Sequence, residues 1–161
     1  MSVKILEVKK ESFPAARFIG KKYTQGPNWG EWWENDWFSV LEKNERLLNN
    51  GDAYIGAVHI VNGMPEYWIG MFFPVNTEVP EGFDFVDIDS LDYVVCYLQD
   101  KEGSSDFYTM ETHNLCLEKL KSLGFKRKED DWCFERYNCP RFTSPDNNGK
   151  VILDYGISIE S

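Results

Sequence analysis

The sequence predicts an α+β protein in which one antiparallel sheet carries two long helices on one face, with a central groove between them. Two observations support this class. Two long segments place apolar residues at helical spacing, whereas shorter segments around them are rich in Val, Ile, Tyr and Phe with the two-residue period of strands. The segments also follow the order strand, helix, strand, strand, and then repeat it. Sheets and helices of this kind bury their apolar faces against each other.

The first predicted helix runs from Asn28 to about residue 50. A Gly-Pro pair interrupts the segment before it, and the side chain of Asn28 is suited to capping a helix start. Glu31 and Glu34 lie in the first turns, where the helix dipole favours negative charge. We expect Gly51 to end the helix.

Tryptophans dominate this predicted helix. Trp29, Trp33 and Trp37 are spaced four residues apart on one apolar stripe that continues to Leu47 and Leu48. Because such a stripe is more often core than site, we assign Trp29 and Trp37 to the core, and Trp33, which lies between them, to the groove wall. Both Trp32 and Phe38 fall outside the stripe, so they must meet solvent, a neighbouring loop or a ligand.

The second predicted helix runs from about Phe107 to Leu123, and Gly124 closes it. Its acidic Glu111 suits the dipole at the helix start, and we interpret His113 as a packed histidine rather than a catalytic one. The expected inner face consists of Met110, His113, Cys116, Leu117, Leu120 and Leu123.

Turn-forming residues separate the predicted strands, as in "VNGMP" at 61–65, "VPEGF" at 79–83 and "SPDNNGK" at 144–150. The strands are expected near 4–9, 16–23, 53–61, 67–74, 83–88, 91–98, 132–137 and 151–159.

The two halves of the chain show a weak internal similarity. Shifting the first half by 75 residues lays Trp33 on Tyr108, and a larger shift for the final hairpin lays Gly70 on Gly156. We therefore expect a single domain over residues 1–161, with one half at about 1–80 and the other at about 81–161. Two such halves can join edge to edge, which protects edges that would otherwise aggregate.

The net charge of −10 makes the protein a poor binder of polyanions, because contact with nucleic acid depends on Lys and Arg neutralising phosphates. A cationic or neutral partner suits this field better, and the aromatic content of 16% offers surface for an apolar one. The N-terminal "MSVKILEVKK" has no signal-peptide pattern and no apolar run reaches membrane-spanning length, so we expect a cytoplasmic protein without membrane contact.

Metal and cofactor chemistry find little support in the residues. The four cysteines show no CxxC pairing and only two histidines accompany them, so we expect mostly buried, reduced thiols and no metal site. The chain also lacks a Gly-rich phosphate loop and a GxSxG motif. We expect no cofactor.

Three stretches carry a family resemblance: "YWIGMFFPVNTEVPEGFDFVDI" at 67–88, "CFERYNCPRF" at 133–142 and "VILDYGISI" at 151–159. Together with the order of elements they resemble the GyrI-like small-molecule-binding domain, also described as the AraC/BmrR-type effector-binding domain. The resemblance implies two β-α-β-β repeats related by a pseudo-twofold axis. It also implies a groove between the repeats that binds hydrophobic, often cationic compounds, including drugs. A glutamate on the strand after the second helix faces this groove in the family, and Glu135 is the matching position.

Many relatives carry a DNA-binding helix-turn-helix before this domain, as transcription regulators do. Here the first predicted strand begins within a few residues of Met1, so we expect a stand-alone member. Such members include proteins that sequester toxic compounds, and some resemble hydrolases of genotoxins.

The alternation of a strand supports a pocket independently of the family. On "WCFERY", Cys133, Glu135 and Tyr137 share one face, and Arg136 lies on the other. A carboxylate on an apolar face is expensive to bury unpaired. The alternatives to a pocket are an ion pair with a nearby Arg or Lys, or exposure of Glu135 at a sheet edge. In a pocket, desolvation would raise the pKa of Glu135, which could pair with a ligand cation or act as a general base. Tyr137 could donate a hydrogen bond.

Aromatic residues complete the predicted ligand site. Trp33 and Tyr108 match each other across the repeat, and Tyr155 lies on the last strand. Tyr67 and Trp68 point to opposite faces of their strand, so one of them should face the groove, and the pattern leaves open which.

Three functions follow. The first is binding of hydrophobic or cationic aromatic small molecules, for sensing or sequestration of toxic compounds. The second is hydrolysis of a reactive genotoxic compound by Glu135 in the same groove. The third is a protein-interaction module like gyrase inhibitors, in which the acidic surface docks a protein partner.

Overall fold

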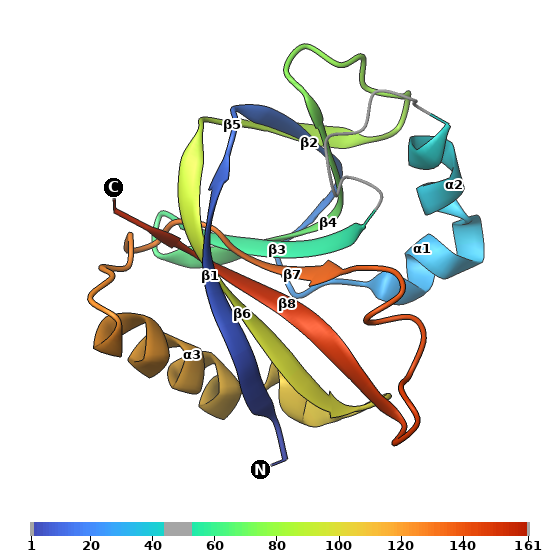
Figure 1. Ribbon diagram of the computed structural model, residues 1–161. Helices are drawn as coiled ribbons and strands as arrows, with labels where there is room; N and C mark the ends of the chain where they lie inside the picture. Colours follow the sequence, from blue (N-terminus) through green and yellow to red (C-terminus); the bar gives the residue numbers. More distant parts are fainter. Residues whose placement is uncertain (1, 44–52, 161) are drawn as a thin grey trace.

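The computed structural model describes residues 2–43 and 53–160, which form an eight-stranded antiparallel sheet with short helices (Figure 1). This confirms the α+β class, and each predicted strand is present with bounds that differ by a few residues. The strands are β1 (Lys4–Phe13), β2 (Ala16–Tyr23), β3 (Tyr54–Val61), β4 (Met64–Pro74), β5 (Asp84–Ile88), β6 (Leu91–Lys101), β7 (Cys133–Tyr137) and β8 (Lys150–Ile159). The helices are α1 (Trp29–Asn35), α2 (Trp37–Glu42), the 3-10 helix η1 (Ser105–Tyr108) and α3 (Met110–Ser122).

The strand order, β1-β6-β8-β7-β3-β4-β2-β5, shows the internal repeat. The antiparallel pair β3–β7 lies at the centre of this order. On either side of it the strands correspond, with β4 matching β8 and β2 matching β6. The register agrees with the shift seen in the sequence, because Gly20 pairs with Gly70, and Val95, 75 residues after Gly20, pairs with Gly156. The halves therefore join edge to edge at β3 and β7, as predicted.

The outer strands are exchanged between the halves. β1 leads the first repeat but pairs with β6 of the second, and β5 leads the second repeat but pairs with β2 of the first. Phe13 at the end of β1 also contacts Phe72 of β4, with ring centroids 5.9 Å apart, because the sheet is strongly curved (Figure 1). The two halves thus interlock around an aromatic cluster on the concave face.

The first helix differs from its prediction as one long helix. Asn28 caps α1 as expected, accepting a hydrogen bond from the Glu31 N–H at 3.3 Å. The helix then breaks at Asp36, whose left-handed backbone (φ 51°, ψ 42°) separates α1 from α2. The predicted continuation through Leu47 and Leu48 to the glycine stop lies outside the described residues.

The burial of the aromatic residues on α1 and α2 also differs from the prediction. Trp32 (0% exposed) and Phe38 (2% exposed), expected outside the apolar stripe, form the core beneath α1 and α2. Trp29 and Trp37, expected in the core, are half-buried and pack against this cluster. For Phe38 the prediction was wrong because it continued one helical phase through Asp36, and for Trp32, which precedes the break, the predicted inner face of α1 was wrong.

α3 starts after the cap residue Thr109 and presents Cys116 and Leu120 to the core. His113 and Leu117 are half-buried beside them, as predicted. The ends of the predicted inner face were wrong: Met110 (69%) and Leu123 (50%) are exposed, because they lie at the helix termini, beyond the part that packs on the sheet.

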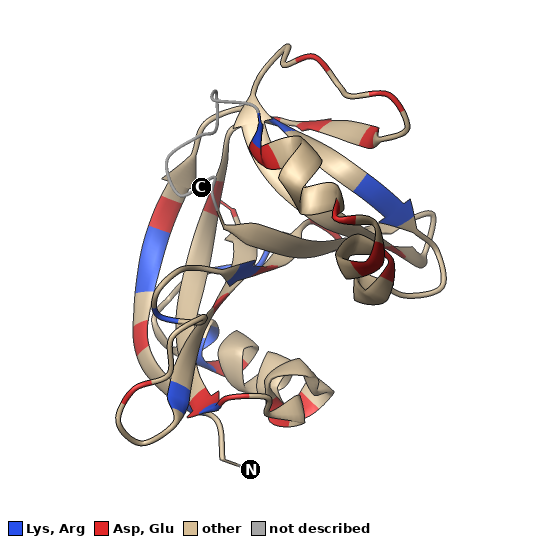
Figure 2. Cartoon of the chain, turned by 90° about the vertical axis from the view of Figure 1, so that its right-hand side faces the viewer, with Lys and Arg blue, Asp and Glu red and all other residues tan. Residues whose placement is uncertain are grey.

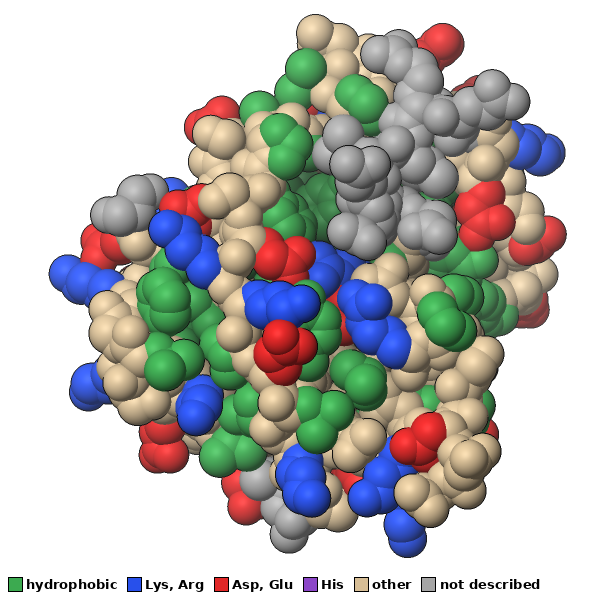
Figure 3. Space-filling model, in the orientation of Figure 1, with side chains coloured by type: hydrophobic (Ala, Val, Ile, Leu, Met, Phe, Trp, Pro, Cys, Tyr) green, Lys and Arg blue, Asp and Glu red, His purple; other side chains and the backbone are tan. Residues whose placement is uncertain are grey.

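All four cysteines are free thiols, of which Cys139 is exposed and the others are buried. Within residues 2–43 and 53–160, no helix is long and apolar enough to cross a membrane, and no group of three or more His, Cys, Asp or Glu side chains is arranged to hold a metal ion. Figure 3 shows acidic and basic side chains interspersed on the face that carries β1.

Candidate functional site

A cavity of about 970 Å³ lies between α1–α2 of the first half and η1 of the second, over the strands β3 and β7. Figure 2 shows α1 and α3 on the same side of the sheet. Sites for drug-sized molecules measure about 300–1,000 Å³, so the cavity, which we call the main cavity, is large enough for one. Its walls consist of Pro27, Trp29, Trp33, Glu42, Tyr54, Tyr108, Glu135, Tyr137, Cys139, Phe142 and Thr143.

The helical walls present aromatic rings. Trp29 and Trp33 are one turn apart on α1, and their rings stack with centroids 6.4 Å apart. Tyr108 contributes from η1 on the opposite side, so the two residues matched by the sequence repeat, Trp33 and Tyr108, both line this cavity and are exposed. Aromatic faces at these positions offer stacking area and attract cations.

Glu135 sits at the floor of the main cavity. On the neighbouring strand Gly56 lies beside it, and a Cβ atom at Gly56 would be 3.2 Å from Glu135 Oε2 and 3.0 Å from the Trp29 ring. The glycine therefore leaves room for the carboxylate and the indole. Tyr137 donates a hydrogen bond to Glu135 Oε2 at 2.5 Å, and its oxygen is 3.4 Å from that of Tyr108.

The electrostatics of this pair follow from burial. Desolvation raises the pKa of Glu135, and the hydrogen bond from Tyr137 only partly opposes this. Burial and the nearby Glu135 carboxylate raise the pKa of Tyr137 well above its usual value, so the phenol remains a donor at neutral pH. Among the described side chains no cation forms an ion pair with Glu135.

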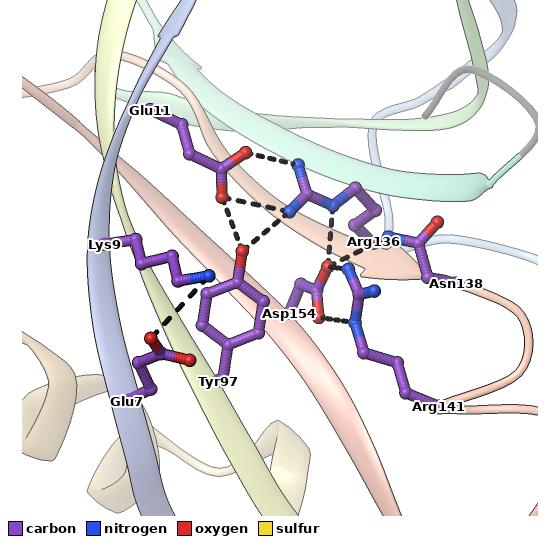
Figure 4. Close-up of polar contacts among 8 residues, drawn as sticks. All are labelled: Glu7, Lys9, Glu11, Tyr97, Arg136, Asn138, Arg141 and Asp154. Atoms are coloured by element: carbon purple, nitrogen blue, oxygen red, sulfur yellow. Dashed lines mark hydrogen bonds and ion pairs between the residues drawn. The ribbon is translucent and has the colours of Figure 1, made fainter. Parts of the chain in front are cut away.

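The nearest arginine in sequence cannot neutralise Glu135, because Arg136 points to the opposite face of β7. Figure 4 shows its guanidinium between two carboxylates. Glu11 accepts from both terminal nitrogens at 3.1 Å, and Asp154 accepts from Nε at 2.7 Å. Tyr97, Asn138 and Arg141 complete this buried ionic cluster.

Tyr67, Trp68 and Tyr155 lie deeper than the main cavity. Two smaller cavities, of about 100 and 280 Å³, adjoin it at Glu135, and both are lined by Tyr67 and Tyr155. Trp68 borders the smaller one, but its ring is buried against Phe18 in the cluster on the concave face, with centroids 6.0 Å apart. The structure thus places Tyr67 rather than Trp68 on the face of Glu135.

Several residues of the main cavity are not predicted from the sequence. Trp29 is predicted in the core, and Glu42, Tyr54 and Phe142 are not among the predicted site residues. The pairing of β3 with β7 puts Tyr54 opposite Tyr137. Tyr54 could therefore have been predicted as a site residue from the expected edge-to-edge join of the halves. Neither Glu42 nor Phe142 has such a signal, because loops and the end of α2 bring them to the site.

No protein-family model and no curated protein matches the chain. Solved structures do. SAV2435 bound to tetraphenylphosphonium is 16% identical, with a TM-score of 0.63 over 97% of this chain and 95% of that one. The EcmrR C-terminal domain is 10% identical, with a TM-score of 0.62 over 96% of this chain and 98% of that one. The chain has the GyrI-like fold.

A third protein of similar fold is a hydrolase encoded by lin2189 from Listeria innocua, which is 9% identical with a TM-score of 0.57 over 96% of this chain and 92% of that one. At these identities the likeness concerns the GyrI-like fold alone. What the site of this chain does must therefore be argued from its own residues.

Proposed function

We propose that the chain binds hydrophobic, cationic aromatic small molecules in the main cavity, and thereby senses or sequesters such compounds. The observation that carries the proposal is Glu135, a carboxylate on the floor of an aromatic cavity with no cationic partner among the described residues. A bound cation would supply that partner, while the rings of Trp29, Trp33 and Tyr108 pack against its apolar groups.

Two further observations support this proposal. The net charge of −10 attracts cations and repels nucleic acid, so we propose a small molecule as the partner and no direct contact with DNA or RNA. SAV2435, which shares the fold, was solved with tetraphenylphosphonium, a cation surrounded by aromatic rings.

Hydrolysis is the second candidate function, because Glu135 has the properties of a general base. Its raised pKa brings it nearer to neutral pH, where general bases work best, and Tyr137 holds it at 2.5 Å. The carboxylate would take a proton from a water molecule that attacks a reactive ligand, and Tyr137 could hydrogen-bond the leaving atom. The likeness to the lin2189 hydrolase is compatible with this reaction.

The change Glu135→Gln tests both candidates, since it keeps the shape and removes the charge. Affinity for tetraphenylphosphonium, measured by tryptophan fluorescence and by the rise in Tm, should fall by about 1–3 kcal/mol, the loss expected for a charge-assisted contact. Neutral triphenylphosphine oxide should bind as before. Glu34→Gln is the matched control, because Glu34 is exposed and does not line the main cavity.

Equal losses for the cation and the neutral compound would contradict a charge-selective site, and so would an equal loss in the Glu34→Gln control. For the hydrolase, Glu135→Gln should abolish turnover of a reactive genotoxin while binding remains measurable, because a general base acts mainly in the transition state. Full turnover in this variant would exclude Glu135 as the base.

A further inference from the structure

The cavity of about 280 Å³ that adjoins the main cavity at Glu135 has a chemistry of its own. The segment after α3 supplies Arg127 to its wall, α3 supplies His113 and β8 supplies Tyr155. The volume is below that of sites for drug-sized molecules but is several times the roughly 30 Å³ that one water occupies in the liquid. The cavity is therefore suited to a single small polar or charged group.

Arg127 is an arginine without a carboxylate partner. Of the four arginines that the structure describes, Arg17, Arg136 and Arg141 each form an ion pair with a carboxylate. For Arg127 no such pair exists within the described residues, and its buried Nε has no hydrogen-bond partner. In a chain with 27 acidic and 17 basic residues, an arginine beside a cavity without a carboxylate partner is unexpected. Its side chain instead hydrogen-bonds the thiol of Cys133, a weak acceptor. A buried donor without an acceptor is unfavourable, so an external acceptor would stabilise it.

The acidic residue on the wall of this cavity is already engaged. Asp131 lies 3.0 Å from Lys128 Nζ and accepts a hydrogen bond from the Trp132 N–H at 2.8 Å. At the boundary with the main cavity, Glu135 is held by Tyr137. Neither carboxylate lies within ion-pair distance of Arg127, so the charge of the guanidinium is available to a ligand.

The other polar side chains on this wall include His113, Tyr155, Cys133 and His59, whose Nε2 lies 2.9 Å from Glu66 Oε1. His113 Nδ1 and the Tyr155 hydroxyl are hydrogen-bonded at 2.6 Å. Burial lowers the pKa of His113, nearby Arg127 lowers it further, and burial raises the pKa of Tyr155. Burial also raises the pKa of Cys133 to about 11. His59 is engaged by Glu66, so Arg127 is the basic group on this wall that no described carboxylate pairs, and the His113–Tyr155 pair adds hydrogen-bonding groups.

We propose that this second cavity is an anion subsite in which Arg127 binds the carboxylate of an aromatic acid. The planar guanidinium offers parallel donors that match the two oxygens of a carboxylate. The apolar ring of the acid would extend past Glu135 toward the aromatic walls of the main cavity. This inference goes beyond the proposed cation site, and either proposal can be wrong while the other holds.

The test compares benzoate with benzamide, which has nearly the same shape but no charge. Binding to the full chain is followed by NMR chemical-shift changes of the His113 and Tyr155 side chains and by the rise in Tm. We expect benzoate to bind the wild type more tightly than benzamide. Arg127→Gln should remove this preference by weakening benzoate about 10- to 100-fold, the range for a lost charge-assisted hydrogen bond.

Lys126→Gln is the matched control, because it removes the same charge from a side chain that pairs with Glu160 at 3.2 Å outside this cavity. It should retain the preference for benzoate. The proposal is wrong if the wild type binds benzoate and benzamide alike, a comparison that needs no variant. It is also wrong if folded Arg127→Gln, verified by circular dichroism, still prefers benzoate. Binding of tetraphenylphosphonium should not weaken in Arg127→Gln, which separates the outcome from that of the cation site.

Discussion

Glu135 shows how one carboxylate can be kept without a counterion inside a protein. Its strand alternation turns Arg136 to the opposite face, where Glu11 and Asp154 occupy that guanidinium. Gly56 beside it adds no side chain, and Tyr137 provides one hydrogen bond. The ionised carboxylate of Glu135 therefore destabilises the folded protein, and a bound cation would offset this cost.

This arrangement predicts a dependence of stability on pH. Because burial raises the pKa of Glu135, the folded protein holds this proton more tightly than the unfolded chain. The destabilisation is absent below the ordinary carboxyl pKa of about 4.3 and develops as pH rises through the raised pKa. Glu135→Gln should therefore be more stable than wild type at pH 7, by about 1–2 kcal/mol, with the difference vanishing near pH 4. Urea unfolding at several pH values measures it, and a variant less stable than wild type at pH 7 would instead indicate a structural ion pair.

At the scale of elements, the two short helices α1 and α2 divide their aromatic residues between the core and the main cavity. α1 directs Trp29 and Trp33 to the main cavity and Trp32 to the core, and after the break α2 turns Phe38 into the same core. The Trp32 and Phe38 rings lie 4.4 Å apart between their centroids. Two short helices can thus supply side chains to both the core and the main cavity. In one straight helix that continued α1, Phe38 would not point into the core beside Trp32.

The break should be sensitive to the residue at position 36. Aspartate tolerates the left-handed region, and its carboxylate accepts a hydrogen bond from Ser39 at 2.7 Å. Asp36→Ala should lower the free energy of unfolding by about 1 kcal/mol, because alanine is strained there and the hydrogen bond from Ser39 is lost. Asp36→Gly relieves the strain and should lie within about 0.5 kcal/mol of wild type. Denaturant unfolding distinguishes the two, and equal stabilities would show that the backbone at this position carries no strain.

At the scale of the whole molecule, the exchange of outer strands makes the halves interdependent. β1 lies on the second half, and its Glu11 joins Arg136 of β7 and Tyr97 of β6 in the buried ionic cluster (Figure 4). The main cavity lies between the halves, so its geometry depends on their being held together. The cluster fixes β1 across the join by charge-assisted hydrogen bonds.

Removing the central cation of this cluster should be costly. Arg136→Met leaves Glu11 without its bidentate partner and takes one of the cations from buried Asp154, so unfolding free energy should fall by about 3–5 kcal/mol. Lys10→Met is the matched control on β1, since its pair with Asp92 at 3.6 Å is partly exposed and should contribute no more than about 1 kcal/mol. Thermal and urea unfolding compare the two, and equal losses would mean that the cluster does not hold the halves together.

Local patterns in the sequence determined much of this protein. The period of two placed the strands, with β2 predicted at its observed bounds of Ala16–Tyr23, and put Glu135 and Tyr137 on one face. The cap at Asn28 and the internal repeat could also be predicted from the sequence, because capping and periodicity involve residues close in sequence.

Other features of the site depend on contacts between residues far apart in the sequence. Strand alternation leaves two faces equivalent until a partner strand covers one, so the choice of Tyr67 over Trp68 depended on the pairing with β3 and on the cluster around Phe18. The left-handed backbone of Asp36 is stabilised by burial of Trp32 and Phe38, a gain that no local propensity contains. Whether an arginine forms an ion pair likewise depends on residues distant in sequence. Arg136 pairs with Glu11, 125 residues away in the chain, whereas Arg127 lines a cavity.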